Sequence, residues 1–240
     1  IVGFENIGGS DFADLFTGLT NQTSTILGLG GNDSIIGGNV ADSLYGMDGD
    51  DTVDGGAGND NIEGNNGNDS LLGGAGSDSL RPDGDASPNI IGNDFIDGGL
   101  GVDMLSYYGD TFAGVTVNLS LLTAQNTGGG GTETILNVEN VSGTTFNDTL
   151  TGNSVANFLW GGGGRADILS GLGGDDILQG DSNGSKLFGG NGNDGLYGGS
   201  DTLADGGAGN DTIVATGTLN GGAGNDKITG GAGSFVGSTF

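Results

Sequence analysis

Aspartates at a fixed spacing are the residues of this sequence that can do chemistry. From Gly28 to Arg81 the chain divides into six consecutive nonapeptides, and the sixth position of each is an aspartate, namely Asp33, Asp42, Asp51, Asp60, Asp69 and Asp78. The chain has no His and no Cys, so its side chains offer a metal only oxygen ligands. Carboxylate and carbonyl oxygens suit hard divalent cations and do not select zinc or copper. The spacing therefore predicts a row of similar cation sites.

The same nonapeptides fix two further positions. The first is always Gly and the eighth is always aliphatic, which in the first array gives Ile35, Leu44, Val53, Ile62, Leu71 and Leu80. The register returns after Gly143 in a less regular array, and a shorter pair of units lies within residues 92–106. Aspartates that we predict to be equivalent in these units are Asp94, Asp103, Asp148, Asp167, Asp176, Asp194, Asp211 and Asp226. A Gly, an Asp and an aliphatic residue that recur together indicate a repeat architecture.

These residue types also dictate the element that must position them. Gly lets the backbone turn through positive φ, which brings carbonyl oxygens close together. The residues around the aliphatic position form a short strand whose aliphatic side chain points inward while its neighbours point outward. Two nonapeptides complete one coil, so aspartates 18 residues apart stack on one edge at about 4.8 Å. The sequence thus predicts a solenoid of parallel strands.

Stacked carboxylates oppose this fold unless a cation neutralises them. Two carboxylates about 5 Å apart repel by roughly 1 kcal/mol in water and by several kcal/mol at an effective dielectric near 20. One buried aliphatic side chain per unit contributes about 1.5–3 kcal/mol, whereas ordering each backbone residue costs about 1–2 kcal/mol. Burial alone therefore cannot hold the coils. Calcium is the cation we expect, because magnesium prefers a smaller octahedral shell and retains water.

The nonapeptides resemble the GGxGxDxUx unit of the repeats-in-toxin (RTX) calcium-binding family, over roughly two thirds of the chain. The resemblance implies an all-β, right-handed parallel β-roll. Each Ca²⁺ ion would lie between turns two units apart, bound by their Asp side chains and turn carbonyls, with about six to ten ions in all. The pairs expected first are Asp33/Asp51, Asp42/Asp60, Asp51/Asp69 and Asp60/Asp78. The glycines implied in these turns are Gly37, Gly46, Gly49, Gly55, Gly56, Gly58, Gly64, Gly67, Gly73, Gly74, Gly76, Gly189, Gly190, Gly192, Gly206, Gly207, Gly209, Gly221, Gly222 and Gly224.

Departures from the repeat mark the doubtful sites. Asn157 and Ser185 replace the aspartate and Arg165 falls within a turn, so sites that touch them should be weak or empty. The segment from Arg81 to Asn89 holds both prolines and is expected to form a lateral loop. An extra Ca²⁺ site at Asp83 and Asp85 is the alternative interpretation of this loop.

Composition excludes several classes of function. Asp and Glu outnumber Lys and Arg by 31 to 4, which gives a net charge of −27. No basic patch is available for nucleic acid or anionic membranes. No apolar run approaches the roughly 20 residues that span a membrane, so no membrane insertion is expected. With no His for a triad and no unique pair of carboxylates, we expect no enzyme activity in this chain.

A longer period overlies the nonapeptides. Residues 1–18 align without gaps on residues 135–152, so the chain contains most of a tandem module and is expected to be a fragment of a longer protein. The expected divisions are the end of a preceding module (1–27), a first array (28–81), a lateral loop with two short repeats (82–106), a non-metal β insert that continues the solenoid (107–142), a second array (143–233) and a truncated end (234–240).

The function expected is that of a calcium-binding structural module that folds on binding Ca²⁺ after export. It would be part of a large extracellular adhesin, surface-layer or matrix protein, and the alternative is the β-roll tail of an exported enzyme or toxin. The resemblance implies type I secretion from a Gram-negative bacterium. Expected partners besides Ca²⁺ are neighbouring modules, end-to-end copies of the chain, and cell-surface or matrix components.

Overall fold

The computed structural model describes residues 5–84, 91–109, 113–164, 166–180, 184–230 and 234–235. Its regular structure over these residues is entirely β, and they include no helix that could cross a membrane. The chain forms two compact units. Unit 1 comprises Ile1–Phe112 with Leu121–Val138, and unit 2 comprises Ala113–Ser120 with Glu139–Phe240.

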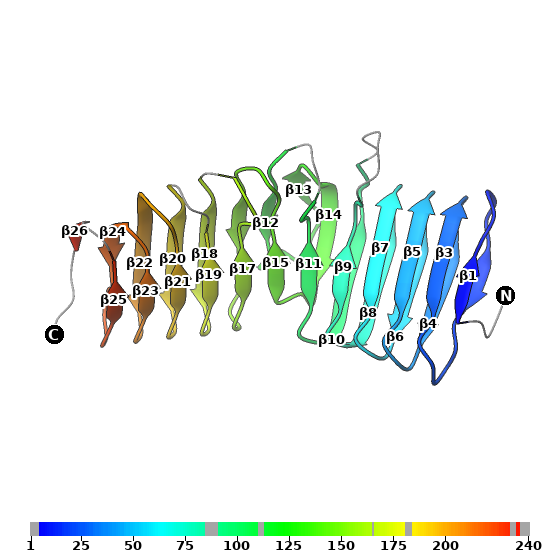
Figure 1. Ribbon diagram of the computed structural model, residues 1–240, viewed down its shortest axis with the longest axis horizontal. Coiled ribbons are helices and arrows are strands. Elements are labelled where there is room, and N and C mark those ends of the chain that lie inside the picture. The colour runs from blue at the N-terminus through cyan, green and yellow to red at the C-terminus, as the bar shows by residue number, and fades with distance from the viewer. Residues whose placement is uncertain are drawn as a thin grey trace. The chain divides into compact units, whose positions relative to one another are not determined.

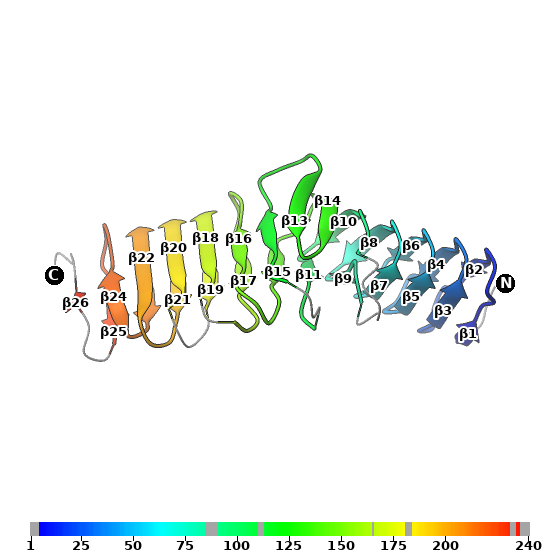
Figure 2. The ribbon, with the colours of Figure 1, turned by 90° about the horizontal axis from the view of Figure 1, so that it is seen from above.

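In unit 1 successive strands alternate between two parallel layers, as Figures 1 and 2 show. The first layer contains β1 (Asn6–Gly8), β3 (Thr25–Gly30), β5 (Ser43–Asp48), β7 (Asn61–Asn66), β9 (Ser79–Arg81) and β11 (Met104–Ser106). The second contains β2 (Leu15–Thr17), β4 (Ser34–Gly38), β6 (Thr52–Gly56), β8 (Ser70–Gly76), β10 (Phe95–Gly101) and β14 (Gly131–Leu136). One strand, β13 (Gln125–Gly128), pairs with β14 in the antiparallel sense.

Unit 2 repeats this alternation. One layer contains β15 (Asn140–Ser142), β17 (Phe158–Trp160), β19 (Ile177–Gln179), β21 (Gly195–Tyr197), β23 (Thr212–Val214) and β25 (Lys227–Thr229). The other contains β12 (Thr116–Asn118), β16 (Thr149–Thr151), β18 (Ile168–Gly173), β20 (Lys186–Asn191), β22 (Thr202–Ala208), β24 (Gly217–Asn220) and β26 (Ser234–Phe235). The paired strands of this unit are parallel.

The strand register confirms the predicted coil of 18 residues. Thr25 pairs with Ser43, and Ser43 pairs with Asn61, so each step along the layer advances the chain by two nonapeptides. The coil length changes outside the first array, because Thr202 pairs with Gly217 only 15 residues later. The chain is therefore a parallel β-solenoid whose loops vary in length while its strands keep their register.

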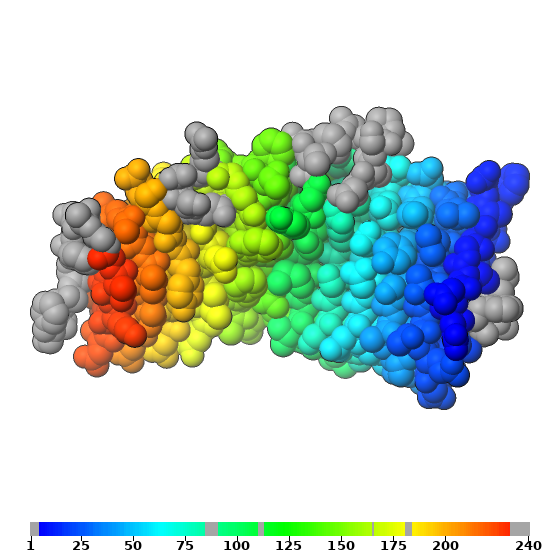
Figure 3. Space-filling model, viewed as in Figure 1, coloured from blue at the N-terminus to red at the C-terminus, as the bar shows by residue number. Residues whose placement is uncertain are grey.

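The core of each unit is a ladder of single side chains. Every column member is at most 1% exposed, and neighbouring members pair through the strand register. In unit 1 the columns are Ile26, Leu44, Ile62, Leu80 and Leu105, and Phe16, Ile35, Val53, Leu71, Ile96 and Ile135. In unit 2 they are Val141, Leu159, Leu178, Leu196 and Ile213, and Val117, Leu150, Leu169, Leu187, Ala204 and Leu219. The predicted inward position of the aliphatic residue is confirmed, and Figure 3 shows the coils of each unit stacked closely around it.

The ladder predicts that one truncated core residue costs much of the stability. Leu71→Ala should lower the free energy of unfolding in saturating calcium by about 2–5 kcal/mol, because the loss of its methyl groups leaves a cavity. Leu100→Ala is the matched control, since Leu100 is 76% exposed and Leu71 is fully buried. Urea unfolding followed by circular dichroism measures both, and equal effects of the two substitutions would contradict this ladder.

Candidate metal centre

Aspartates form two columns in unit 1, each member directly before a strand. One column contains Asp14, Asp33, Asp51, Asp69 and Asp94, and the other contains Asp42, Asp60, Asp78 and Asp103 after Ser24. The repeat aspartates in these columns are at most 4% exposed. The backbone N–H of Asp33 donates to Oδ1 of Asp51 at 2.7 Å, and the same bond joins Asp42 to Asp60. The four pairs expected first thus lie in adjacent coils, while their binding of calcium stays a prediction.

The second carboxylate oxygen is what distinguishes these columns from ordinary turn aspartates. In the described part of the chain, buried Oδ2 atoms without a hydrogen-bond donor belong to Asp33, Asp42, Asp51, Asp60, Asp69, Asp78, Asp94, Asp176, Asp194, Asp211 and Asp226. Buried polar atoms in native proteins nearly always have a partner, and a buried charge without one is costly. A regular series of such oxygens therefore indicates a cation that satisfies them.

Glycine leaves room for this cation. A Cβ on Gly46 would occupy the space between Oδ2 of Asp51 and the carbonyl oxygen of Gly64 in the next coil. The same arrangement recurs at the other first-position glycines, which place a carboxylate oxygen beside the missing side chain at Gly37, Gly55, Gly64, Gly73, Gly189, Gly206 and Gly221. Each site thus combines carboxylate and carbonyl oxygens from two coils, which is the donor set that Ca²⁺ prefers.

The remaining predicted glycines shape the turns. All of them have positive φ, namely Gly49, Gly56, Gly58, Gly67, Gly74, Gly76, Gly190, Gly192, Gly207, Gly209, Gly222 and Gly224. Gly67 illustrates the second constraint, because a Cβ there would meet the carbonyl oxygen of Gly49 one coil earlier. The turns therefore stack backbone on backbone along the axis, which repeats the carbonyl donors at the same interval as the carboxylates.

Burial and crowding raise the pKa of the stacked carboxyl groups. Burial is the main cause at Asp69, whose pKa rises to about 8, and the carboxylates of Asp94 and Asp51 add to it. Burial also raises the pKa of Asp51 and of Asp60 to about 6. The N–H groups of the preceding coil oppose this rise because they favour the charged form. Near neutral pH the metal-free columns thus hold groups that resist ionisation together.

Unit 2 has one continuous column and one interrupted column. Asp176, Asp194, Asp211 and Asp226 follow one another in register, and the N–H of Asp211 donates to Oδ1 of Asp226 at 3.0 Å. Spacing alone left the partners of Asp211 and Asp226 open, because these steps are 17 and 15 residues long. The other column keeps Asp148 and Asp167 and then continues with Ser185 and Thr202.

The structure places the doubtful positions as follows. Asn157 stands in the column before Asp176, and its amide is engaged by protein groups, with Nδ2 donating to the carbonyl of Glu139 at 2.7 Å. Asp148 also has protein donors, since Oδ2 accepts the N–H of Thr144 at 2.9 Å. Arg165 and Asp85 lie outside the described residues. Sequence reasoning missed Asp14, which stands before Asp33 at a step of 19 residues, and it missed Glu133.

Removal of one column carboxylate should weaken calcium binding selectively. Asp51→Asn should lower the affinity of its sites at least about tenfold, because a direct ligand is lost. Asp50→Asn is the matched control, since Asp50 is adjacent but exposed and accepts hydrogen bonds from Asn68. Isothermal titration calorimetry compares the two, and equal weakening would mean that net charge rather than ligation governs binding.

The pKa shifts predict that the metal-free chain loses β structure as the pH rises. The column carboxyl groups titrate near pH 3.8 when unfolded and near pH 6–8 when folded, so the folded state binds more protons in this window. Metal-free β structure should therefore be greatest near pH 4 and fall towards pH 8. Saturating calcium should reverse the trend, because the ion binds deprotonated carboxylates. Circular dichroism over this range tests both signs, and a metal-free signal that grows with pH would contradict the assignment.

Comparison with known proteins agrees with this geometry. The family described as RTX calcium-binding nonapeptide repeat (4 copies) matches residues 27–62, 45–80, 91–107, 142–178, 162–184, 170–202, 203–217 and 216–234. A search of curated proteins gave no significant match. The matched segments cover more than half of the chain and contain the aspartate columns from Asp33 to Asp103 and from Asp176 to Asp226. This chain therefore belongs to the RTX calcium-binding nonapeptide repeat family, as a structural β-roll module.

Proposed function

We propose that this β-roll is a calcium-ordered structural module of a large extracellular protein such as an adhesin, surface-layer or matrix protein. The module would remain unfolded where calcium is scarce and would fold where calcium is abundant. The single observation that carries the proposal is the series of buried Oδ2 atoms without a donor, repeated in successive coils of both units.

The charge of the chain supports a folding switch. A net charge of −27 with few aromatic residues is typical of chains that stay disordered. Without cations, closure of the roll would bury rows of carboxylates at the spacing of β-strands. With cations, the free energy of metal binding becomes free energy of folding. Such a chain suits export in an unfolded state, and RTX repeats are typical of secreted proteins.

Internal likeness favours a tandem structural role over a terminal tail. Asn6 and Asn140 lie 134 positions apart and begin the equivalent strands β1 and β15. The strands β2 and β16 begin at Leu15 and Thr149, with the same offset. Each of these two strands follows an aspartate of the column, and each compact unit therefore opens in the same way.

The likeness extends to hydrogen bonds. Oδ2 of Asp14 accepts the N–H and the hydroxyl of Ser10, both at 2.8 Å. Oδ2 of Asp148 accepts the N–H and the hydroxyl of Thr144 at 2.9 and 3.3 Å. At these first coils a hydroxyl residue four positions earlier supplies the donor that later coils lack. A unit that opens with its own polar cap is suited to tandem arrays, in which each copy follows another.

The decisive measurement is far-UV circular dichroism of the chain, from metal-free buffer to about 10 mM calcium, with magnesium as the control. We expect a cooperative transition to β structure with calcium and none with magnesium at equal concentration, because the sites need more ligands than an octahedral ion accepts. A β spectrum that is complete in chelator, and unchanged by calcium, would refute the folding switch.

A further inference from the structure

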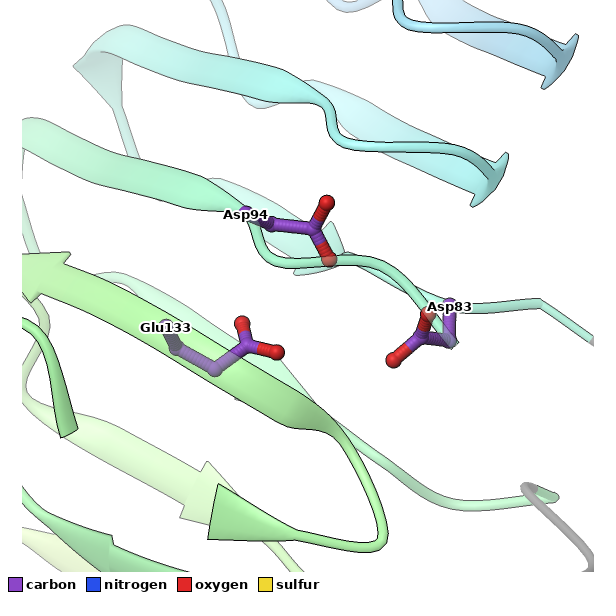
Figure 4. Close-up of side chains that lie close together, drawn as sticks. All are labelled: Asp83, Asp94 and Glu133. Atoms are coloured by element: carbon purple, nitrogen blue, oxygen red, sulfur yellow. The ribbon is translucent and has the colours of Figure 1, made fainter. Parts of the chain in front are cut away.

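Three carboxylates converge in unit 1 outside the regular spacing of the repeat. They belong to Asp83, which follows β9, to Asp94, which precedes β10, and to Glu133 in β14. Their oxygens all lie within 4.8 Å of one another. Asp83 is 8% exposed, Asp94 is 3% exposed and Glu133 is fully buried. Figure 4 shows the three side chains directed into one shared space.

The strand register explains why Glu133 reaches this space. Phe95 pairs with Thr134, so Glu133 occupies the position next in the column after Asp94. An aspartate stands there in every earlier coil of this column, and glutamate adds one methylene that carries its carboxylate further from the strand. The antiparallel pairing of β13 with β14 begins at the same residue, where Gln125 pairs with Glu133. The column therefore ends in a longer acidic side chain where the regular repeat stops.

Asp83 is also fixed in place by the backbone. Its Oδ1 accepts the N–H of Gly92 at 2.9 Å, which ties the two ends of the segment between β9 and β10 together. Oδ1 of Asp94 accepts the N–H of Asp69 at 2.7 Å. Each of the two aspartates keeps a buried Oδ2 that no hydrogen-bond donor reaches. Two oriented and nine-tenths buried carboxylates thus present an open acceptor to the same space.

We propose that Asp83, Asp94 and Glu133 bind one Ca²⁺ ion at a site separate from those between aspartates two nonapeptides apart. The donors are all carboxylate oxygens, and Glu133 can supply both of its own, as hard cations with high coordination numbers require. The ion would join the segment after β9 to the β13–β14 hairpin. It would thereby fasten the end of the first array, where the 18-residue spacing is lost and coil length no longer holds the register. This site is independent of where the protein works.

The test counts bound ions on the whole chain by native mass spectrometry at saturating calcium. Glu133→Gln and Asp83→Asn should each bind one ion fewer than the wild type, and the double variant should also bind one fewer. The affinity of the missing ion falls at least about tenfold with loss of a direct ligand. Glu63→Gln is the matched control, because it removes the same charge from the outer side of β7 and should keep the full count.

A second readout separates the site from the columns. Hydrogen exchange of peptides that cover 91–94 and 131–136 should slow with calcium in the wild type and remain faster in both variants, while the far-UV transition persists. Wild-type ion counts in both variants would overturn the proposal, as would a double variant that lacks two ions. Loss of several ions together with β structure in both variants would make these residues supports of the columns and would also overturn it. Absence of any calcium transition in the wild type would instead refute the proposed folding switch.

Discussion

The structure depends on carboxylates that the fold buries in register. The strands of a parallel solenoid repeat at a fixed interval, so an aspartate before each strand is stacked on its equivalent in the next coil. One oxygen of each carboxylate accepts a backbone N–H from the neighbouring coil, and this bond sets the column. The other oxygen is buried beside a glycine, where the absence of a Cβ leaves space. Repulsion and ligation thus arise from the same atoms, and a cation converts one into the other.

Glycine is required at some turn positions more strictly than at others. Leu29, Met47 and Asn65 occupy the second position of alternate nonapeptides with φ near 80°, at a cost of about 1–2 kcal/mol each for the left-handed conformation. The fourth position, as in Gly49 and Gly67, combines positive φ with a carbonyl one coil away where a Cβ would have to be placed. A side chain is tolerated where only φ is unfavourable. It is not tolerated where the backbone of the next coil takes its space.

The sequence was sufficient for the solenoid, its core and the first aspartate pairs, because a constant period of 18 residues determines which residues stack. It was insufficient where loop length varies. Asp194, Asp211 and Asp226 stack through steps of 17 and 15 residues, and Glu133 enters the column after Asp94 from a segment without repeats. Strand register rather than spacing places these residues. Asp83 is a further case, since its partners become adjacent only when the segment after β9 returns to Gly92.

The interrupted column of unit 2 shows what happens when the carboxylate is absent. After Asp148 and Asp167 the column continues with Ser185 and Thr202, which carry no charge and therefore need no cation. Thr202 bonds to its own turn, with the hydroxyl donating to the carbonyl of Gly199 and the N–H to the carbonyl of Thr216. These coils are short, and protein donors and acceptors replace the metal. The edge that keeps Asp176, Asp194, Asp211 and Asp226 has no such replacement for their Oδ2 atoms. Calcium dependence in unit 2 should therefore reside in one edge of the roll, because only there does closure bury charge.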